Sequence, residues 1–191
     1  MSDEIKNKAK HIKILLTDCD GVLTDGGVYY GNDGEFLKKF NFKDGMGVER
    51  LRNLVQVSTG IITGEVSPSV IKRATKLQIT ELHLGIKNKV AILMQILVNH
   101  NLIKEQIAYI GDDVNDIEIM QKVGLSACPA DAISFTKNIA DYICEKKGGD
   151  GCFREFAELI IASKLLESVI HATSLLKLVS ITTAPWKLQK N

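Results

Sequence analysis

Paired cysteines and an excess of charge of either sign are both missing from this sequence of 191 residues. The four cysteines, at positions 19, 128, 144 and 152, form no Cys-x-x-Cys motif. This argues against a thiolate metal site or a redox pair and favours buried, reduced thiols. Lys and Arg number 24 against 23 Asp and Glu, a formal net charge of +1, whereas nucleic-acid-binding domains usually carry a strongly basic face. We therefore expect no nucleic acid among the partners.

Long apolar runs are missing as well. No uninterrupted apolar stretch is long enough to span a bilayer, and residues 1–10 are charged and contain no apolar signal region. We therefore expect a cytoplasmic protein without a membrane partner. The sequence has no internal repeat and no low-complexity segment, and its length suits one domain with a sizeable core.

The feature that stands out is an apolar run, Ile12–Leu16, that leads to Asp18 and Asp20. In an extended chain, side chains two residues apart point to the same side. Two carboxylates that close repel each other unless a cation lies between them, and a divalent cation with oxygen ligands is the usual solution. Asp-x-Asp-Gly could instead be only a polar turn closing a hairpin. A strand that is apolar on both faces favours a site at its carboxyl end.

Short apolar strands alternate with helical patterns along the rest of the chain. We expect strands at 12–16, 55–63, 79–84, 107–110, 125–128 and 141–144, and helices at 48–54, 68–77, 88–100, 117–123, 130–139 and 152–179. This alternation predicts an α/β fold with a doubly wound, mostly parallel, Rossmann-like sheet and no separate cap domain. We expect a single domain over 1–191, with a C-terminal helix and tail over about 152–191.

A protruding β-hairpin is predicted over about 28–41, where two β-rich runs flank the turn Asn32-Asp33-Gly34. An isolated two-stranded hairpin is marginally stable in water. Because this one is rich in aromatic and apolar residues, we expect it to pair with copies of itself in an oligomer.

Chemically active residues fall at or just after the predicted strand ends, where ligands bind in such sheets. They are Asp18 and Asp20, Thr63, Lys87 or Lys89, and Asp112 with Asp113 and Asp116. Phosphoryl transfer to an aspartate uses such a set, because a carboxylate attacks phosphorus while a cation, an ammonium and hydroxyl or amide donors neutralise the charge.

The sequence resembles the haloacid dehalogenase superfamily of phosphatases, whose first signature, Asp-x-Asp-Gly-x-x-Thr, is complete here from Asp18 to Thr24. The resemblance implies that Asp18 is the nucleophile and a Mg²⁺ ligand. It implies that Asp20 is the general acid/base and binds the metal through its backbone carbonyl. Thr63 with Gly64 matches the second signature, and Lys89, or less closely Lys87, matches the third. The fourth, Gly111–Asp116, implies that Asp112 is a metal ligand and that Asp113 and Asp116 support the site.

Within that superfamily the chain most resembles the capless 3-deoxy-D-manno-octulosonate 8-phosphate phosphatases, over roughly residues 12–159. Stretches that carry this resemblance include Gly34-Glu35 with Lys38, Lys43–Gly45 and Gly148–Gly151. It implies a homotetramer assembled through the hairpin and hydrolysis of that sugar-acid phosphate for lipopolysaccharide synthesis. Thr24, Gly64 and Arg154 are its candidate substrate-binding residues. A helix-start surface charge is the alternative interpretation of Arg154.

The same residues also have to be weighed against other substrates and other classes of protein. The motifs do not separate an eight-carbon from a nine-carbon, sialic-type sugar-acid phosphate. A receiver-type signalling module also places acids, a Thr and a Lys around a phosphorylated Asp, but the strand ending at Thr63 lacks the acceptor Asp that it needs. The complete acid set argues against a catalytically silent oligomeric partner.

Overall fold

A sheet of six parallel strands lies at the centre of the computed structural model, which describes residues 2–182 and the side chains of residues 2–169. In sheet order the strands are β5 (Glu81–His83), β4 (Ser58–Ile62), β1 (Ile14–Thr17), β6 (Ile107–Ile110), β7 (Leu125–Cys128) and β8 (Tyr142–Ile143). β2 (Tyr29–Gly31) and β3 (Gly34–Leu37) form a separate antiparallel hairpin. The predicted doubly wound α/β fold is confirmed.

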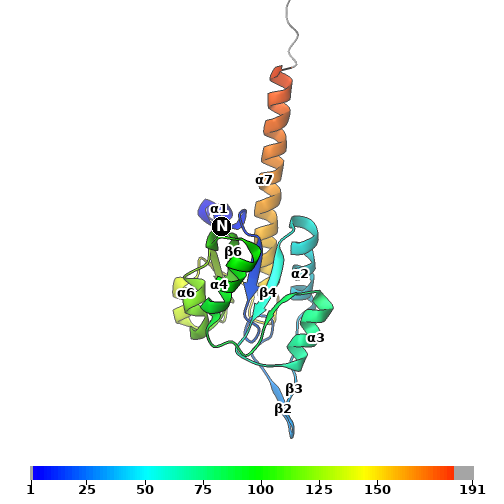
Figure 1. Ribbon diagram of the computed structural model, residues 1–191, viewed down its shortest axis with the longest axis vertical. Coiled ribbons are helices and arrows are strands. Elements are labelled where there is room, and N and C mark those ends of the chain that lie inside the picture. Colours follow the sequence, from blue (N-terminus) through cyan, green and yellow to red (C-terminus); the bar gives the residue numbers. More distant parts are fainter. Residues whose placement is uncertain (1, 183–191) are drawn as a thin grey trace, which may run out of the picture.

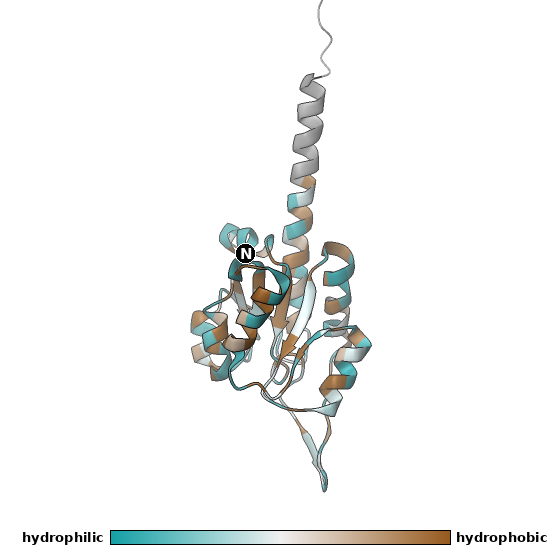
Figure 2. Ribbon diagram, viewed as in Figure 1, coloured by the Kyte–Doolittle hydropathy of each residue, from teal (hydrophilic) through white to brown (hydrophobic). Residues whose placement is uncertain are grey.

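Helices cover both faces of the sheet (Figure 1). One face carries α2 (Phe42–Val55), α3 (Pro68–Leu77), α7 (Cys152–Thr182) and α1 (Asp3–Ala9), and the other carries α4 (Lys89–His100), α5 (Ile117–Met120) and α6 (Ser134–Ile139). Two short 3₁₀ helices, η1 (Lys104–Gln106) and η2 (Val114–Asp116), flank β6. Side chains of β1 alternate between two cores, Leu15 facing the one with Phe153 and Leu16 the one with Tyr109. Figure 2 shows apolar residues gathered where helices meet the sheet.

Helix α2 differs from the prediction because it begins at Phe42 rather than at residue 48. The side chain of Asn41 caps it by accepting a hydrogen bond from the Lys43 amide. Its two early glycines allow close packing rather than a turn: a Cβ on Gly45 would lie 2.5 Å from Arg73 Nη2, and one on Gly47 would lie 3.2 Å from Arg154 Cα. The helix then continues to Val55, so β4 is shorter than the predicted strand.

The loop between β8 and α7 lies directly on the loop that follows β1. The Gly149 amide donates to Val22 O at 2.9 Å, and a Cβ on Gly148 would lie 2.0 Å from Gly21 O. Asn41 Nδ2 donates to Gly149 O at 3.0 Å. This loop therefore supports the turn that contains Asp20 and Thr24.

The hairpin and the far end of α7 project from opposite ends of the molecule (Figure 1). Helix α7 has 31 residues, about 46 Å at the helical rise, and it leads away from the end of the sheet where the hairpin begins. Residues 183–191, the last part of the predicted tail, lie outside the described residues. In the part of the chain that is described, no helix is both long and apolar enough to traverse a bilayer.

Candidate active site

Parallel pairing brings three strand ends to the same level. Thr17, the last residue of β1, pairs with Ile61 of β4 and Ile110 of β6, and the Asp18 amide donates to Ile110 O at 3.0 Å. The residues that follow these ends line an open cleft of about 270 Å³, formed by Asp18, Asp20, Thr63, Gly64, Glu65, Asp112, Asp113, Val114 and Asn115. The structure therefore brings together the acids near position 20 and those near position 115.

Three carboxylates come close enough to share a cation. One oxygen each of Asp18, Asp112 and Asp116 lies within 4.8 Å of the other two. Gly21 makes room for this cluster: its φ is +88°, and a Cβ there would lie 2.0 Å from Asp112 Oδ2. A side chain at position 21 would push Asp112 out of the site.

Both carboxylate oxygens of Asp116 accept hydrogen bonds from other groups of the protein. It is fully buried, and its Oδ1 accepts from Lys89 Nζ and from the Tyr109 hydroxyl, both at 2.6 Å. Its Oδ2 accepts from the backbone amides of Asp112 at 3.0 Å and Asp113 at 3.4 Å. Asp116 therefore fixes the lysine and the loop rather than offering a free oxygen, which agrees with a supporting role.

Asp18 and Asp112 have oxygens that remain available. Oδ1 of each is buried; that of Asp112 accepts no hydrogen bond from the described residues, and that of Asp18 is paired only with Lys89 Nζ, at 3.1 Å. Burial, followed by repulsion from Asp18, raises the pKa of Asp112 to about 8. Burial and then the charge of Asp116 raise the pKa of Asp18 as well. Buried carboxylates that repel one another and keep an oxygen only partly paired within the protein fit a hard divalent cation.

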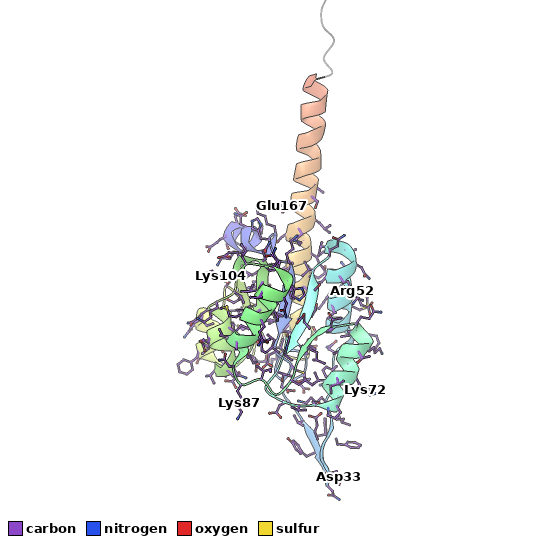
Figure 3. All side chains as sticks on the ribbon, viewed as in Figure 1. Asp33, Arg52, Lys72, Lys87, Lys104 and Glu167 are labelled. Atoms are coloured by element: carbon purple, nitrogen blue, oxygen red, sulfur yellow. The ribbon has the colours of Figure 1, made fainter. Side chains whose placement is uncertain are left out.

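Lys89, rather than Lys87, reaches the acids. The side chain of Lys89 is 2% exposed and bridges Asp18 and Asp116, whereas Lys87 is exposed and lies on the outer surface (Figure 3). Burial alone would lower the pKa of Lys89, but the charges of Asp18 and Asp116 outweigh it and raise that pKa. Lys89 therefore keeps a fixed positive charge beside the predicted nucleophile.

Asp20 is held by two groups. Its Oδ1 accepts from Thr24 Oγ1 at 3.2 Å, and its Oδ2 accepts from Lys38 Nζ at 2.5 Å. The sequence drew attention to Lys38 only as part of a resemblance and not at all to Tyr109. Lysine after a surface hairpin and tyrosine within an apolar strand carry no local signal of a site.

The side chains of two predicted site residues, Arg154 and Asp113, bind other groups of the protein. Arg154 is absent from the lining of the cleft, and its Nε pairs with Glu158 Oε1 at 2.7 Å. Asp113 lines the cleft but its Oδ1 accepts from the Val114 amide at 2.6 Å and caps η2. Within one chain, the contacts of Arg154 are those of a helix-start charge.

Comparison with known proteins agrees with this geometry. The family model of haloacid dehalogenase-like hydrolases matches residues 60–156. The chain belongs to this family. This hydrolase is 39% identical to 3-deoxy-D-manno-octulosonate 8-phosphate phosphatase of Escherichia coli K12 over 164 residues, 86% of this chain and 87% of that protein.

Solved structures extend the similarity of this hydrolase. The phosphatase of the same name from Yersinia pestis has a TM-score of 0.83 at 38% identity, covering 86% of this chain and 88% of that one. The one from Moraxella catarrhalis has a TM-score of 0.84 at 34% identity, covering 91% and 99%, and was solved in complex with a magnesium ion, a phosphate ion and a KDO molecule.

The two lysines make a matched test of the site. We expect Lys89→Met to lower kcat for phosphate-ester hydrolysis by about 10²-fold or more, because one preorganised donor to a charged transition state is commonly worth that much. Lys87→Met removes the same charge from the surface and should leave kcat within about twofold. Steady-state phosphate release, with thermal unfolding as the check on folding, measures both. If Lys87→Met lost activity and Lys89→Met kept it, the assignment of Lys89 as the lysine of the site would be contradicted.

Proposed function

We propose that this hydrolase is a Mg²⁺-dependent phosphatase that converts 3-deoxy-D-manno-octulosonate 8-phosphate to the free sugar acid and phosphate. The observation that carries the proposal is the pair of buried carboxylate oxygens of Asp18 and Asp112, of which the first is paired only with Lys89 and the second accepts no hydrogen bond from the described residues. Relatives named for this activity, 39% identical over most of the chain, support the substrate class. We place the reaction in lipopolysaccharide precursor synthesis in the cytoplasm, carried out by one domain over 1–191.

The residues of the cleft divide the reaction into two steps. In the first, a carboxylate oxygen of Asp18 bonds to phosphorus as the bond from phosphorus to the sugar oxygen breaks, and Asp20 gives its proton to that departing oxygen. In the second, water attacks phosphorus of the aspartyl-phosphate and gives a proton to Asp20. Phosphate leaves, and both aspartates return to their starting states.

The other residues position and neutralise. Lys89 offsets the charge of the phosphoryl oxygens, and the Thr63 hydroxyl and the Gly64 amide are the donors that we assign to them. The Thr63 hydroxyl is already oriented, because it accepts from the Glu65 amide at 3.3 Å. Thr24 orients Asp20, and Asp113 and Asp116 shape the loop that presents Asp112.

Mg²⁺ is the cation that we assign to Asp18, Asp112 and the backbone carbonyl of Asp20. Two structural relatives hold divalent ions, magnesium in the Moraxella catarrhalis protein and cobalt in that of Haemophilus influenzae. When bound, such a cation would offset the negative charge of the carboxylates and so allow an anionic phosphate ester to approach Asp18.

The size of the sugar acid is the first property to test. We expect kcat/KM for the eight-carbon 8-phosphate to exceed that for a nine-carbon, sialic-type 9-phosphate by about tenfold or more, because one extra carbon is worth about 10–200-fold in a fitted site. Phosphate release is measured for both, with Mg²⁺ and with EDTA, alongside Asp18→Asn. Strong activity in EDTA, or in Asp18→Asn, would contradict the cation-dependent nucleophile. Preference for the nine-carbon substrate would change the substrate but not the chemistry.

We propose a homotetramer assembled through the hairpin, since the described residues of one chain leave its outer aromatic side chains exposed. Tyr30 is 75% and Phe36 74% exposed, and the hairpin stands clear of the body with Asp33 at its tip (Figure 3). Arg154 would then be a candidate substrate anchor for a neighbouring site, where its guanidinium suits a carboxylate.

Sedimentation equilibrium tests the assembly. We expect a species of four 21.0 kDa chains for the unaltered protein. The double change Tyr30→Ser and Phe36→Ser should give smaller species, because it removes the two most exposed aromatic side chains of the hairpin. Phe135→Ser, a change at an exposed aromatic residue on α6, is the control and should keep the mass. A monomeric unaltered protein, or an unchanged mass in the double variant, would overturn the proposal.

A further inference from the structure

Two lysines are buried in the described part of the chain, and both contact the acids of the site. Lys89 bridges Asp18 and Asp116. The other, Lys38, directly follows β3, and its side chain is 1% exposed. Removing an ammonium from water costs several kcal/mol unless partners restore the lost interactions. Its nearest partner is Asp20, so the hairpin stem delivers a charge to the predicted general acid.

Lys38 completes the restraint on Asp20. Thr24, on the same loop as Asp20, donates to Oδ1, and Lys38, from a separate element, donates to Oδ2 at 2.5 Å. Two donors on different oxygens fix both the position and the plane of a carboxylate. With Thr24 alone, the carboxylate could still rotate about that single contact.

Lys38 has a second carboxylate partner besides Asp20. Glu35 Oε2 lies 3.7 Å from its Nζ, while Glu35 Oε1 accepts a hydrogen bond from the Ser67 hydroxyl. Ser67 is buried and caps α3 by accepting from the Val70 amide at 3.4 Å. The ammonium therefore pairs with two carboxylates, that of Asp20 in the site and that of Glu35, which is itself bound to the N-cap residue of α3.

We propose that Lys38 is a positioning residue that holds the Asp20 carboxylate in the orientation from which it delivers its proton to the departing oxygen. The inference rests on the proposed function, in which Asp20 is the general acid. A residue that acts in this way matters when the leaving oxygen needs a proton and matters little when it does not. Dependence on the leaving group is an effect that a merely structural lysine would not produce.

Three substrates distinguish a leaving oxygen that needs a proton from one that does not. They are the sugar-acid phosphate, phenyl phosphate and p-nitrophenyl phosphate. The two aryl esters differ by one nitro group, which lies opposite the ester oxygen, and nitrophenolate leaves readily without a proton. We measure kcat/KM, because it reports the steps up to loss of the leaving group. In Lys38→Met it should fall by about tenfold or more for the first two esters and by less than about threefold for the third, since general acid catalysis contributes about 10²–10⁴-fold. Because the ratios are taken on one preparation, incomplete folding cancels.

Lys39→Met is the matched control, because Lys39 is the adjacent lysine and pairs with Asp25 at the surface. It should leave all three values within about twofold. Lys38→Arg should recover part of the loss for the sugar-acid phosphate. In an Asp20→Asn background, Lys38→Met should cause no further fall for that substrate, because its partner has already been removed.

An equal loss on all three esters, or a full further loss in the Asp20→Asn background, would overturn the inference and leave the proposed function intact. Failure of the unaltered protein to hydrolyse any of the three with Mg²⁺ would instead overturn the proposed function.

Discussion

Repulsion among buried carboxylates is the constraint on which the rest of this structure depends. Asp18, Asp112 and Asp116 are brought within 4.8 Å of one another by parallel pairing of β1 with β6, at a place where water cannot screen them well. The backbone is adapted to this crowding, since a Cβ on Gly111 would lie 2.4 Å from the Asp116 carboxyl carbon. Keeping the acids together lowers the stability of the fold. Such a cost is expected of a functional site and not of a turn with only a structural role.

The site offsets this repulsion in two different ways. Asp116 is satisfied by protein donors, with Lys89 and Tyr109 on one oxygen and backbone amides on the other. Asp112 keeps an oxygen that accepts no hydrogen bond from the described residues, and Asp18 one that is paired only with Lys89, which suits ligands of a cation. Lys38 adds a second fixed positive charge at Asp20, from the hairpin rather than from the sheet. The hairpin therefore contributes to the site of its own chain as well as presenting aromatic residues outward.

Sequence patterns predicted the elements whose signals are local. The strands Ile107–Ile110 and Leu125–Cys128 are confirmed with the expected bounds, because strands buried on both faces are uninterrupted apolar runs. Helix α3 is also confirmed, since Ser67 and Pro68 mark its start. The predicted start of α2 was wrong because Gly45 and Gly47 resemble turn residues. In the structure both lie within the helix and allow it to pack closely against α3 and α7. The placing of Lys38 against Asp20 depends on how the hairpin folds back, which no local pattern records.

The most direct test of a shared cation is the rise in melting temperature on adding Mg²⁺, measured as a function of pH. The pKa of Asp112 is raised to about 8 from an ordinary value of 3.8, and that of Asp18 is raised as well. The folded, metal-free protein therefore binds more protons than the unfolded chain between these values, and its free energy of unfolding falls as pH rises through that window. Mg²⁺ should replace the missing protons, so its effect should be larger at about pH 8 than at about pH 5.5.

At about pH 8 with saturating Mg²⁺ we expect a rise of about 5–10 °C, from a binding contribution of about 2.7 kcal/mol and a shift of about 2–4 °C per kcal/mol. Asp112→Asn should abolish the rise and should itself melt higher than the unaltered protein in EDTA, because it removes one repelling charge. No rise at about pH 8, or the same rise in Asp112→Asn, would contradict a cation held between these two acids.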